Sequence, residues 1–144
     1  MNVLEIPLIK LLGITRNQEN RLQLPFLEET ASYFKTQHAG TQFTLAETAS
    51  VDFIQSEFPH LKGKVELVFR KSETKFRQMS QENIMAFASI NEENKSKFEK
   101  QLNRRGQANI AIDVTLIDTQ NIVTFEGVFY WFVSSNNRKG ELNK

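Results

Sequence analysis

The stretch from residue 39 to residue 58 constrains the fold most, because it is the one long segment that is amphipathic and free of helix breakers. At roughly 100° per residue, its apolar side chains fall on one continuous arc. Pro59 stops a helix here, since proline has no amide hydrogen to donate. The pattern predicts a helix that starts after His38, ends near Phe58 and has an apolar face that other elements must cover. The arc consists of Phe43, Leu45, Ala46, Ala49, Phe53 and Ile54.

One carboxylate lies in an unusual place on this predicted helix. On the helical wheel Glu47 falls between Ile54 and Val51, away from the polar side that carries Asp52. A carboxylate that loses water at such a place has a raised pKa, which suits a general base or a weak nucleophile. The alternative is that Glu47 stands at the border of the apolar stripe and turns its head into solvent, as glutamate usually does.

Alternating apolar residues predict about five strands around this helix, together with two smaller helices. Pro25 places the first strand near a sheet edge, because it cannot donate to a ladder. The last strand is apolar on nearly both faces, which is typical of the middle of a sheet or of a subunit interface. The strands are expected at residues 21–28, 65–79, 82–90, 107–117 and 122–133, and the helices at residues 4–12 and 92–105.

The composition of the chain argues against several classes of function. A chain of 144 residues predicts a single domain, with a polar tail at residues 134–144 that we expect to be disordered. The 18 Lys and Arg against 17 Asp and Glu argue against a nucleic-acid partner and against electrostatic attachment to a membrane. No apolar run approaches the roughly twenty residues of a membrane span, and no signal peptide is visible, so we expect a cytoplasmic protein. With no cysteine and two histidines, no metal-ligand spacing exists.

The segment His38-Ala39-Gly40, with Glu47 nine positions after the histidine, resembles the histidine–glycine–glycine motif of hotdog-fold acyl-CoA thioesterases. In the phenylacetate-degradation branch of that superfamily, an Asp or Glu at this spacing is the catalytic carboxylate. Residues 102–109, which run into two strands, are similar to a subgroup that includes a thioesterase-like domain found fused behind an acetyltransferase in some bacteria. The resemblance covers about residues 11–133.

The resemblance implies an α+β hotdog fold over residues 1–144, in which an antiparallel sheet wraps around one long central helix. It implies an acyl-CoA or related thioester as substrate, with coenzyme A as part of that substrate and no separate cofactor. Hotdog proteins commonly dimerise by joining their sheets edge to edge, so we expect a homodimer or a tetramer. The expected dimer interface lies against the region from His38 to Glu47.

The resemblance also suggests roles for the residues before Glu47. The residue after the histidine supplies the N–H that polarises the thioester carbonyl, which is Ala39 here, and the small Gly40 lets a ligand approach the backbone. His38 orients this loop or lies near the pantetheine, or is an ordinary loop hydrogen bonder. Many relatives have Asn or Gln six residues before the histidine, where this chain has Ser32; Ser32 or Gln37 is a candidate substitute.

Two basic groups are candidates to meet the phosphates of coenzyme A. One comprises Arg70 and Lys71 together with Lys75 and Arg77, and the other is the pair at residues 104–105. A solvated strand face explains both groups equally well.

Two functions therefore compete. The first is a thioesterase that uses Glu47 as base or nucleophile. The alternative is a catalytically silent hotdog protein that binds acyl thioesters or acts as an interaction module, because a fold does not fix a function. The dehydratase branch of the superfamily fits less well, because the spacing of His38 and Glu47 on one helix start matches the thioesterase arrangement.

Overall fold

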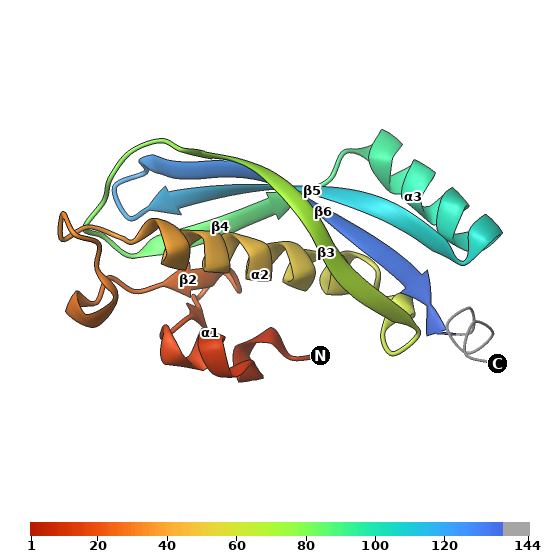
Figure 1. The fold of residues 1–144 in the computed structure, drawn as a ribbon, viewed down its shortest axis with the longest axis horizontal. Coiled ribbons are helices and arrows are strands. Elements are labelled where there is room, and N and C mark those ends of the chain that lie inside the picture. The colour runs from red at the N-terminus through yellow and green to blue at the C-terminus, as the bar shows by residue number, and fades with distance from the viewer. Residues whose placement is uncertain (137–144) are drawn as a thin grey trace.

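The computed structural model describes residues 1–136, in which a six-stranded antiparallel sheet wraps around helix α2 (Ala39–Glu57) (Figure 1). Every pair of neighbouring strands is antiparallel, and the strand order is β1-β2-β4-β5-β6-β3. This arrangement confirms the predicted α+β class and the predicted central helix. The strands are β1 (Thr15–Arg16), β2 (Leu22–Leu24), β3 (Val65–Phe76), β4 (Ile84–Ser89), β5 (Gln107–Asp118) and β6 (Val123–Ser135).

Helix α2 begins and ends where its local sequence predicts. His38 caps its first turn, and Phe58 is its C-cap, directly before Pro59 starts a 3₁₀ turn, η3 (Pro59–Leu61). The helix contacts β2, β4, β5 and β6, so more than the predicted arc is buried. Thr48, expected on the polar side, is one of these additional buried residues, and its hydroxyl donates to the Thr44 carbonyl.

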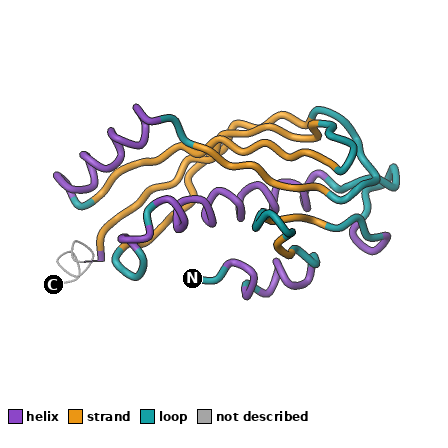
Figure 2. The backbone as a smooth tube through the Cα atoms, turned by 180° about the vertical axis from the view of Figure 1, so that it is seen from behind, coloured by secondary structure: helices purple, strands orange, loops and turns teal. Residues whose placement is uncertain are grey.

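Two further helices accompany α2 and the sheet. The 3₁₀ turn η1 (Val3–Glu5) and helix α1 (Pro7–Leu11) precede β1, and a second 3₁₀ turn, η2 (Glu28–Thr30), follows β2. Helix α3 (Glu92–Arg105) has the predicted bounds. Gly106 ends it in the left-handed region at φ 70°, which glycine adopts without steric cost. Seen from behind, α2 runs along one face of the sheet, whereas α3 lies at one end of it (Figure 2).

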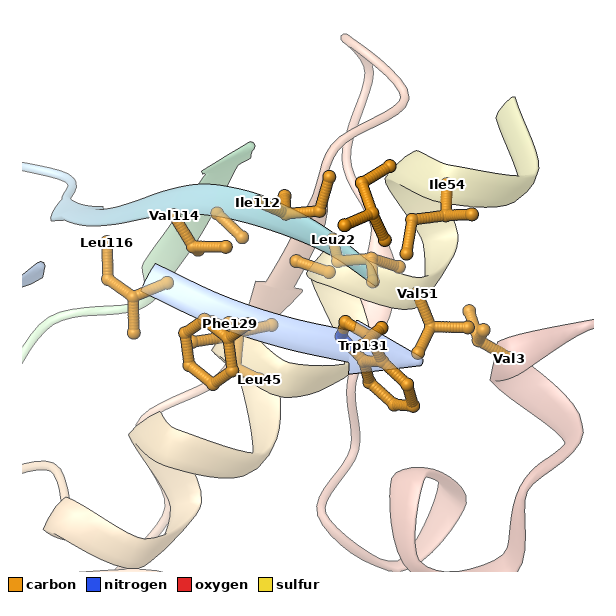
Figure 3. Packing of buried hydrophobic residues seen from close by; sticks show 14 of the residues in the cluster. Val3, Leu22, Leu45, Val51, Ile54, Ile112, Val114, Leu116, Phe129 and Trp131 are labelled. Carbon is orange, nitrogen blue, oxygen red and sulfur yellow. The ribbon is translucent and has the colours of Figure 1, made fainter. Parts of the chain in front are cut away.

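The core lies between α2 and the face of the sheet that it covers (Figure 3). Phe125, Phe129 and Val133 of β6 are buried and lie four residues apart along the strand, so they share this face. Strand β6 lies between β5 and β3, which confirms that the most apolar strand is an interior one. The long strand β3 forms one edge of the sheet, with no neighbour beyond it among the described residues.

Several predicted boundaries were wrong. The sheet has six strands, because the two-residue β1 pairs with β2; Arg16 of β1 also forms a bidentate ion pair with Asp52 of α2, at 2.7 and 2.9 Å. Ser134 and Ser135 belong to β6 and pair with β3, so the predicted tail begins too early. Residues 137–144 of that tail lie outside the described residues. In the described part of the chain, no helix is long and apolar enough to cross a membrane.

Candidate functional site

The first turn of α2 is closed by the histidine that precedes it. His38 has an extended backbone (φ −70°, ψ 139°), and its Nδ1 accepts a 2.8 Å hydrogen bond from the Gly40 N–H. Because Nδ1 is the acceptor, a neutral His38 ring carries its hydrogen on Nε2. The N–H of Gly40, where the sequence predicted that a ligand approaches the backbone, is therefore used inside the cap. The Ala39 N–H, at the first helical position, has no acceptor within an α-helix, and Ala39 is exposed.

Buried polar contacts hold this cap against the sheet. The Gln37 N–H donates to the Ser80 carbonyl at 2.9 Å, and the Gln37 side-chain amide donates to the Glu82 carbonyl at 3.1 Å. The Ser80 hydroxyl donates to a carboxylate oxygen of buried Asp118 at 2.7 Å. The sequence suggested Gln37 as a substrate contact, but its side-chain amide already donates a hydrogen bond to the Glu82 carbonyl. Because Gln37 directly precedes His38, these contacts hold His38 in place.

Glu47 is a half-buried carboxylate about two turns of α2 beyond this cap. Burial raises its pKa above the ordinary 4.5. Among residues 1–136, its carboxylate has no hydrogen bond and no ion pair, although its backbone carbonyl accepts a 2.6 Å bond from the Ser50 hydroxyl. A desolvated carboxylate without a cation is a stronger base than one in water, which matches the expectation from the helical wheel.

Aromatic rings surround the same side of α2. Phe43, one turn before Glu47, lies 5.4 Å from Phe129 and 6.2 Å from Phe69 between ring centroids. Phe69 also lies 5.1 Å from Trp131, whose indole N–H donates to Ser50 at 2.8 Å. Edge strand β3 therefore lies beside the part of α2 that carries Glu47, and apolar rings line the space between them.

The two predicted catalytic groups are far apart within one chain. Ala39 and Glu47 are separated by eight residues of α2, which is about 12 Å of helical rise. The backbone positions of the two residues are therefore more than two turns of α2 apart.

The remaining predicted residues lie elsewhere. The Ser32 hydroxyl is paired with Thr36 Oγ1 at 2.9 Å, inside its own loop. Arg70 and Lys71 stand over the rings of Phe132 and Tyr130, at 5.1 and 4.7 Å. Those rings alternate with the inward residues of β6, so both cations lie on the sheet face opposite to α2 and Glu47.

A β-bulge explains why Arg70 and Lys71 share that face. The pairing of β3 with β6 shifts between Phe69 and Lys71, so Arg70 is an extra residue and the alternation of faces slips by one. No local sequence pattern indicates this bulge. None indicates the role of Ser80 and Asp118 either, because it depends on contacts between distant loops. In the part of the chain that the structure describes, no three His, Asp or Glu side chains gather as metal ligands.

Solved structures share this fold. A probable thioesterase from Pseudomonas aeruginosa superposes with a TM-score of 0.80 at 21% identity, over 93% of this chain and 91% of that one. A Bacillus halodurans protein solved with CoA gives 0.69 at 19%, covering 88% and 74%. The PaaI protein of the Escherichia coli phenylacetic acid degradation operon gives 0.62 at 14%, covering 88% and 83%. At these identities the likeness shows the hotdog thioesterase fold alone.

A family model gives a more direct result. A comparison with curated proteins found no match. The model described as "Putative thioesterase (yiiD_Cterm)" matches residues 3–133, which is most of the chain and includes the cap, Glu47, strands β1 to β5 and β6 as far as Val133. The sequence resemblance to the hotdog thioesterase superfamily is therefore confirmed, and the chain belongs to this thioesterase family.

Proposed function

We propose that this protein hydrolyses acyl-CoA thioesters, with Glu47 as the general base. The observation that carries the proposal is the half-buried Glu47 carboxylate, which has a raised pKa and no cation or hydrogen-bond donor in the described chain. Membership of a thioesterase family supports the reaction class. The Bacillus halodurans protein of the same fold, solved with CoA, supports coenzyme A as the carrier.

In the proposed reaction, the Ala39 N–H donates to the thioester carbonyl oxygen. Its place at the N-terminus of α2 favours negative charge, so it stabilises the oxyanion that forms. The Glu47 carboxylate takes a proton from a water molecule, whose oxygen adds to the carbonyl carbon. When the tetrahedral intermediate collapses, the carbon–sulfur bond breaks, the carboxyl proton goes to the departing thiolate, and the acid and free coenzyme A leave.

We further propose that each site takes these two groups from two copies of the chain. The rise of about 12 Å between Ala39 and Glu47 supports this, because the two residues stand more than two turns apart on one helix. The edge strand β3 supports it as well, because a second copy that joined β3 edge to edge would lie beside the Glu47 face of α2. In this arrangement the homodimer is the catalytic unit.

The first experiment measures thiol release from a panel of acyl-CoA thioesters by the wild type and by Glu47→Gln. Glutamine keeps the shape and removes the basic oxygen, so we expect kcat to fall by at least about a hundredfold, the usual weight of a positioned base. Glu57→Gln is the matched control: it lies on the same helix, pairs with Lys95 at 2.7 Å, and should keep wild-type kcat. Ser32→Ala should cost much less than Glu47→Gln.

A second experiment tests the shared site. Ala39→Pro removes the proposed N–H at a helical position where proline is well tolerated, and Glu92→Pro makes the same change at the start of α3 as a control. Each of Ala39→Pro and Glu47→Gln should be inactive alone. Unfolded and refolded together in equal amounts, they should regain about a quarter of wild-type activity, because half of the dimers then hold one intact site of two. No recovery would show that both groups act within one chain or not at all.

The alternative, a catalytically silent protein that binds acyl thioesters, predicts a different result. If the protein hydrolyses no member of the panel but binds coenzyme A thioesters saturably, it is a binding module. Undiminished hydrolysis by Glu47→Gln would instead remove Glu47 from the mechanism and leave the reaction class in place.

A further inference from the structure

A cavity of about 310 Å³ lies at the C-terminal end of α2, away from the His38 cap. Its walls come from the last turns of the helix, from η3 and from the first residues of β3. The lining is mainly apolar and includes Ile54, Phe58, Leu61, Val65 and Leu67. Neither the cap nor the proposed reaction uses these side chains.

The cavity lies on the same side of α2 as Glu47. Ile54 follows Glu47 by seven residues, which returns to within about 20° of the same direction on an α-helix. Phe58, eleven residues on, returns to within about 20° as well. The Glu47 carboxylate and the inner wall of the cavity therefore belong to one stripe of the helix, about 10 Å apart along its axis.

The facing wall runs in the same direction. Val65, Leu67 and Phe69 are alternate residues of β3, pair with β6 opposite inward-facing positions, and pack against the core. Phe69 lies beside Phe43, near Glu47, whereas Leu67 and Val65 line the cavity. A line of apolar side chains thus runs along β3 from Phe69, near Glu47, to the cavity, with no charged side chain on this face of β3 between Phe69 and Val65.

We infer that this cavity holds the far end of the substrate's acyl group, and that the acyl group is a linear chain of about eight carbons or more. The inference rests on the proposed function, because it measures the chain from a thioester at Glu47. An extended chain of single bonds advances about 1.2 Å per bond, as the polypeptide backbone does, so about eight bonds span the 10 Å to Ile54. Acetyl, butyryl and phenylacetyl groups end before the cavity.

The test compares acetyl-CoA, phenylacetyl-CoA and octanoyl-CoA as substrates of the wild type, Val65→Phe and Val68→Phe. Val65 lines the cavity, whereas Val68, three residues on, is exposed on the opposite face of the sheet. Both variants replace valine with phenylalanine in β3, so any effect of this replacement on strand propensity is the same in the two. Thermal unfolding and sedimentation of each variant show whether the fold and the assembly are kept.

We expect the wild type to prefer octanoyl-CoA over both shorter substrates. Val65→Phe should lower kcat/KM for octanoyl-CoA at least about tenfold, since each excluded methylene costs about fourfold in binding. It should change kcat/KM for acetyl-CoA less than about twofold, and Val68→Phe should change neither. Leu67→Ala, which enlarges the cavity instead of filling it, should shift the preference toward decanoyl-CoA and dodecanoyl-CoA.

Three results would overturn the inference. Hydrolysis without chain-length preference, equal in Val65→Phe, would leave the proposed function intact and remove the cavity from it. A change of oligomeric state in Val65→Phe, with unchanged substrate preference, would make the cavity a contact between copies. Absence of all hydrolysis would refute the proposed function. Calorimetry with octanoyl-CoA would then test whether the cavity binds an acyl chain. No binding, or equal binding by the wild type and by Val65→Phe, would refute that role of the cavity.

Discussion

The indole N–H of Trp131 on β6 donates a 2.8 Å hydrogen bond to the hydroxyl of Ser50 on α2. The Ser50 hydroxyl in turn donates to the backbone carbonyl of Glu47 at 2.6 Å. Both side chains are buried, so this is a polar link inside the core between the helix and the most apolar strand. It anchors α2 to the sheet three residues beyond the proposed base.

Replacing Ser50 with alanine should therefore destabilise the fold. Ser50→Ala leaves the buried indole N–H of Trp131 without an acceptor, which costs about 2 kcal/mol of unfolding free energy. Urea unfolding followed by tryptophan fluorescence measures the loss. Ser56→Ala, an exposed position on the same helix, is the control and should stay within about 0.5 kcal/mol of the wild type. Equal stability of the two variants would mean that the link contributes nothing.

The raised pKa of Glu47 predicts a dependence of stability on pH. In the folded chain Glu47 holds its proton above the ordinary pKa of 4.5, so the folded state binds more protons than the unfolded state in that window. Its contribution to stability is therefore full below pH 4.5 and declines as the pH rises through the raised folded pKa. Glu47→Gln should remove that decline, and urea unfolding of both proteins from pH 4 to pH 8 measures it. Parallel curves for the two proteins would contradict a raised pKa.

Asp118 should show the opposite behaviour. Burial opposes its charged form, but hydrogen bonds from the Ser80 hydroxyl and from the N–H groups of Ile122 and Gln120 outweigh burial and lower its pKa. Its contribution is present at neutral pH and is lost as the pH falls below its ordinary value of 3.8 through the lowered folded pKa.

Asp118→Ala removes an acceptor that three donors share, and we expect it to cost about 3 kcal/mol of unfolding free energy at pH 7. Because Ser80 also accepts from Gln37, kcat/KM should fall as well through the His38 cap. Asp113→Ala, an exposed aspartate on the same strand β5, is the control. Unchanged kcat/KM in Asp118→Ala would mean that the contact between Asp118 and Ser80 has no effect on the His38 cap.

The assembly prediction concerns the edge strand. A homodimer that covers β3 and the Glu47 face of α2 should bury on the order of 2,000 Å² or more, as obligate interfaces do. Sedimentation at micromolar concentration should give the mass of two chains or four. A single 16.7 kDa species would contradict both the dimer and the shared site.

The sequence alone determined the elements whose signals are local. The helix after His38 follows from its period and from Pro59, and α3 follows from its polar pattern and Gly106, whose backbone adopts φ 70°. Capping, periodicity and breakers act within a few residues, so these elements were predicted within one or two positions. The unusual place of Glu47 on the wheel was likewise visible, since a helical wheel depends only on spacing.

Tertiary structure decided what those elements bring together. The bulge at Arg70 puts Lys71 on the far face of the sheet beside Arg70, because one extra residue slips the alternation of faces. The Gly40 N–H donates its hydrogen bond to the His38 ring. The cavity between α2 and β3 is lined by residues that are far apart in the sequence and that no local pattern connects. Register, side-chain hydrogen bonds and cavity shape depend on contacts between segments distant in the chain, and a linear pattern carries no record of them.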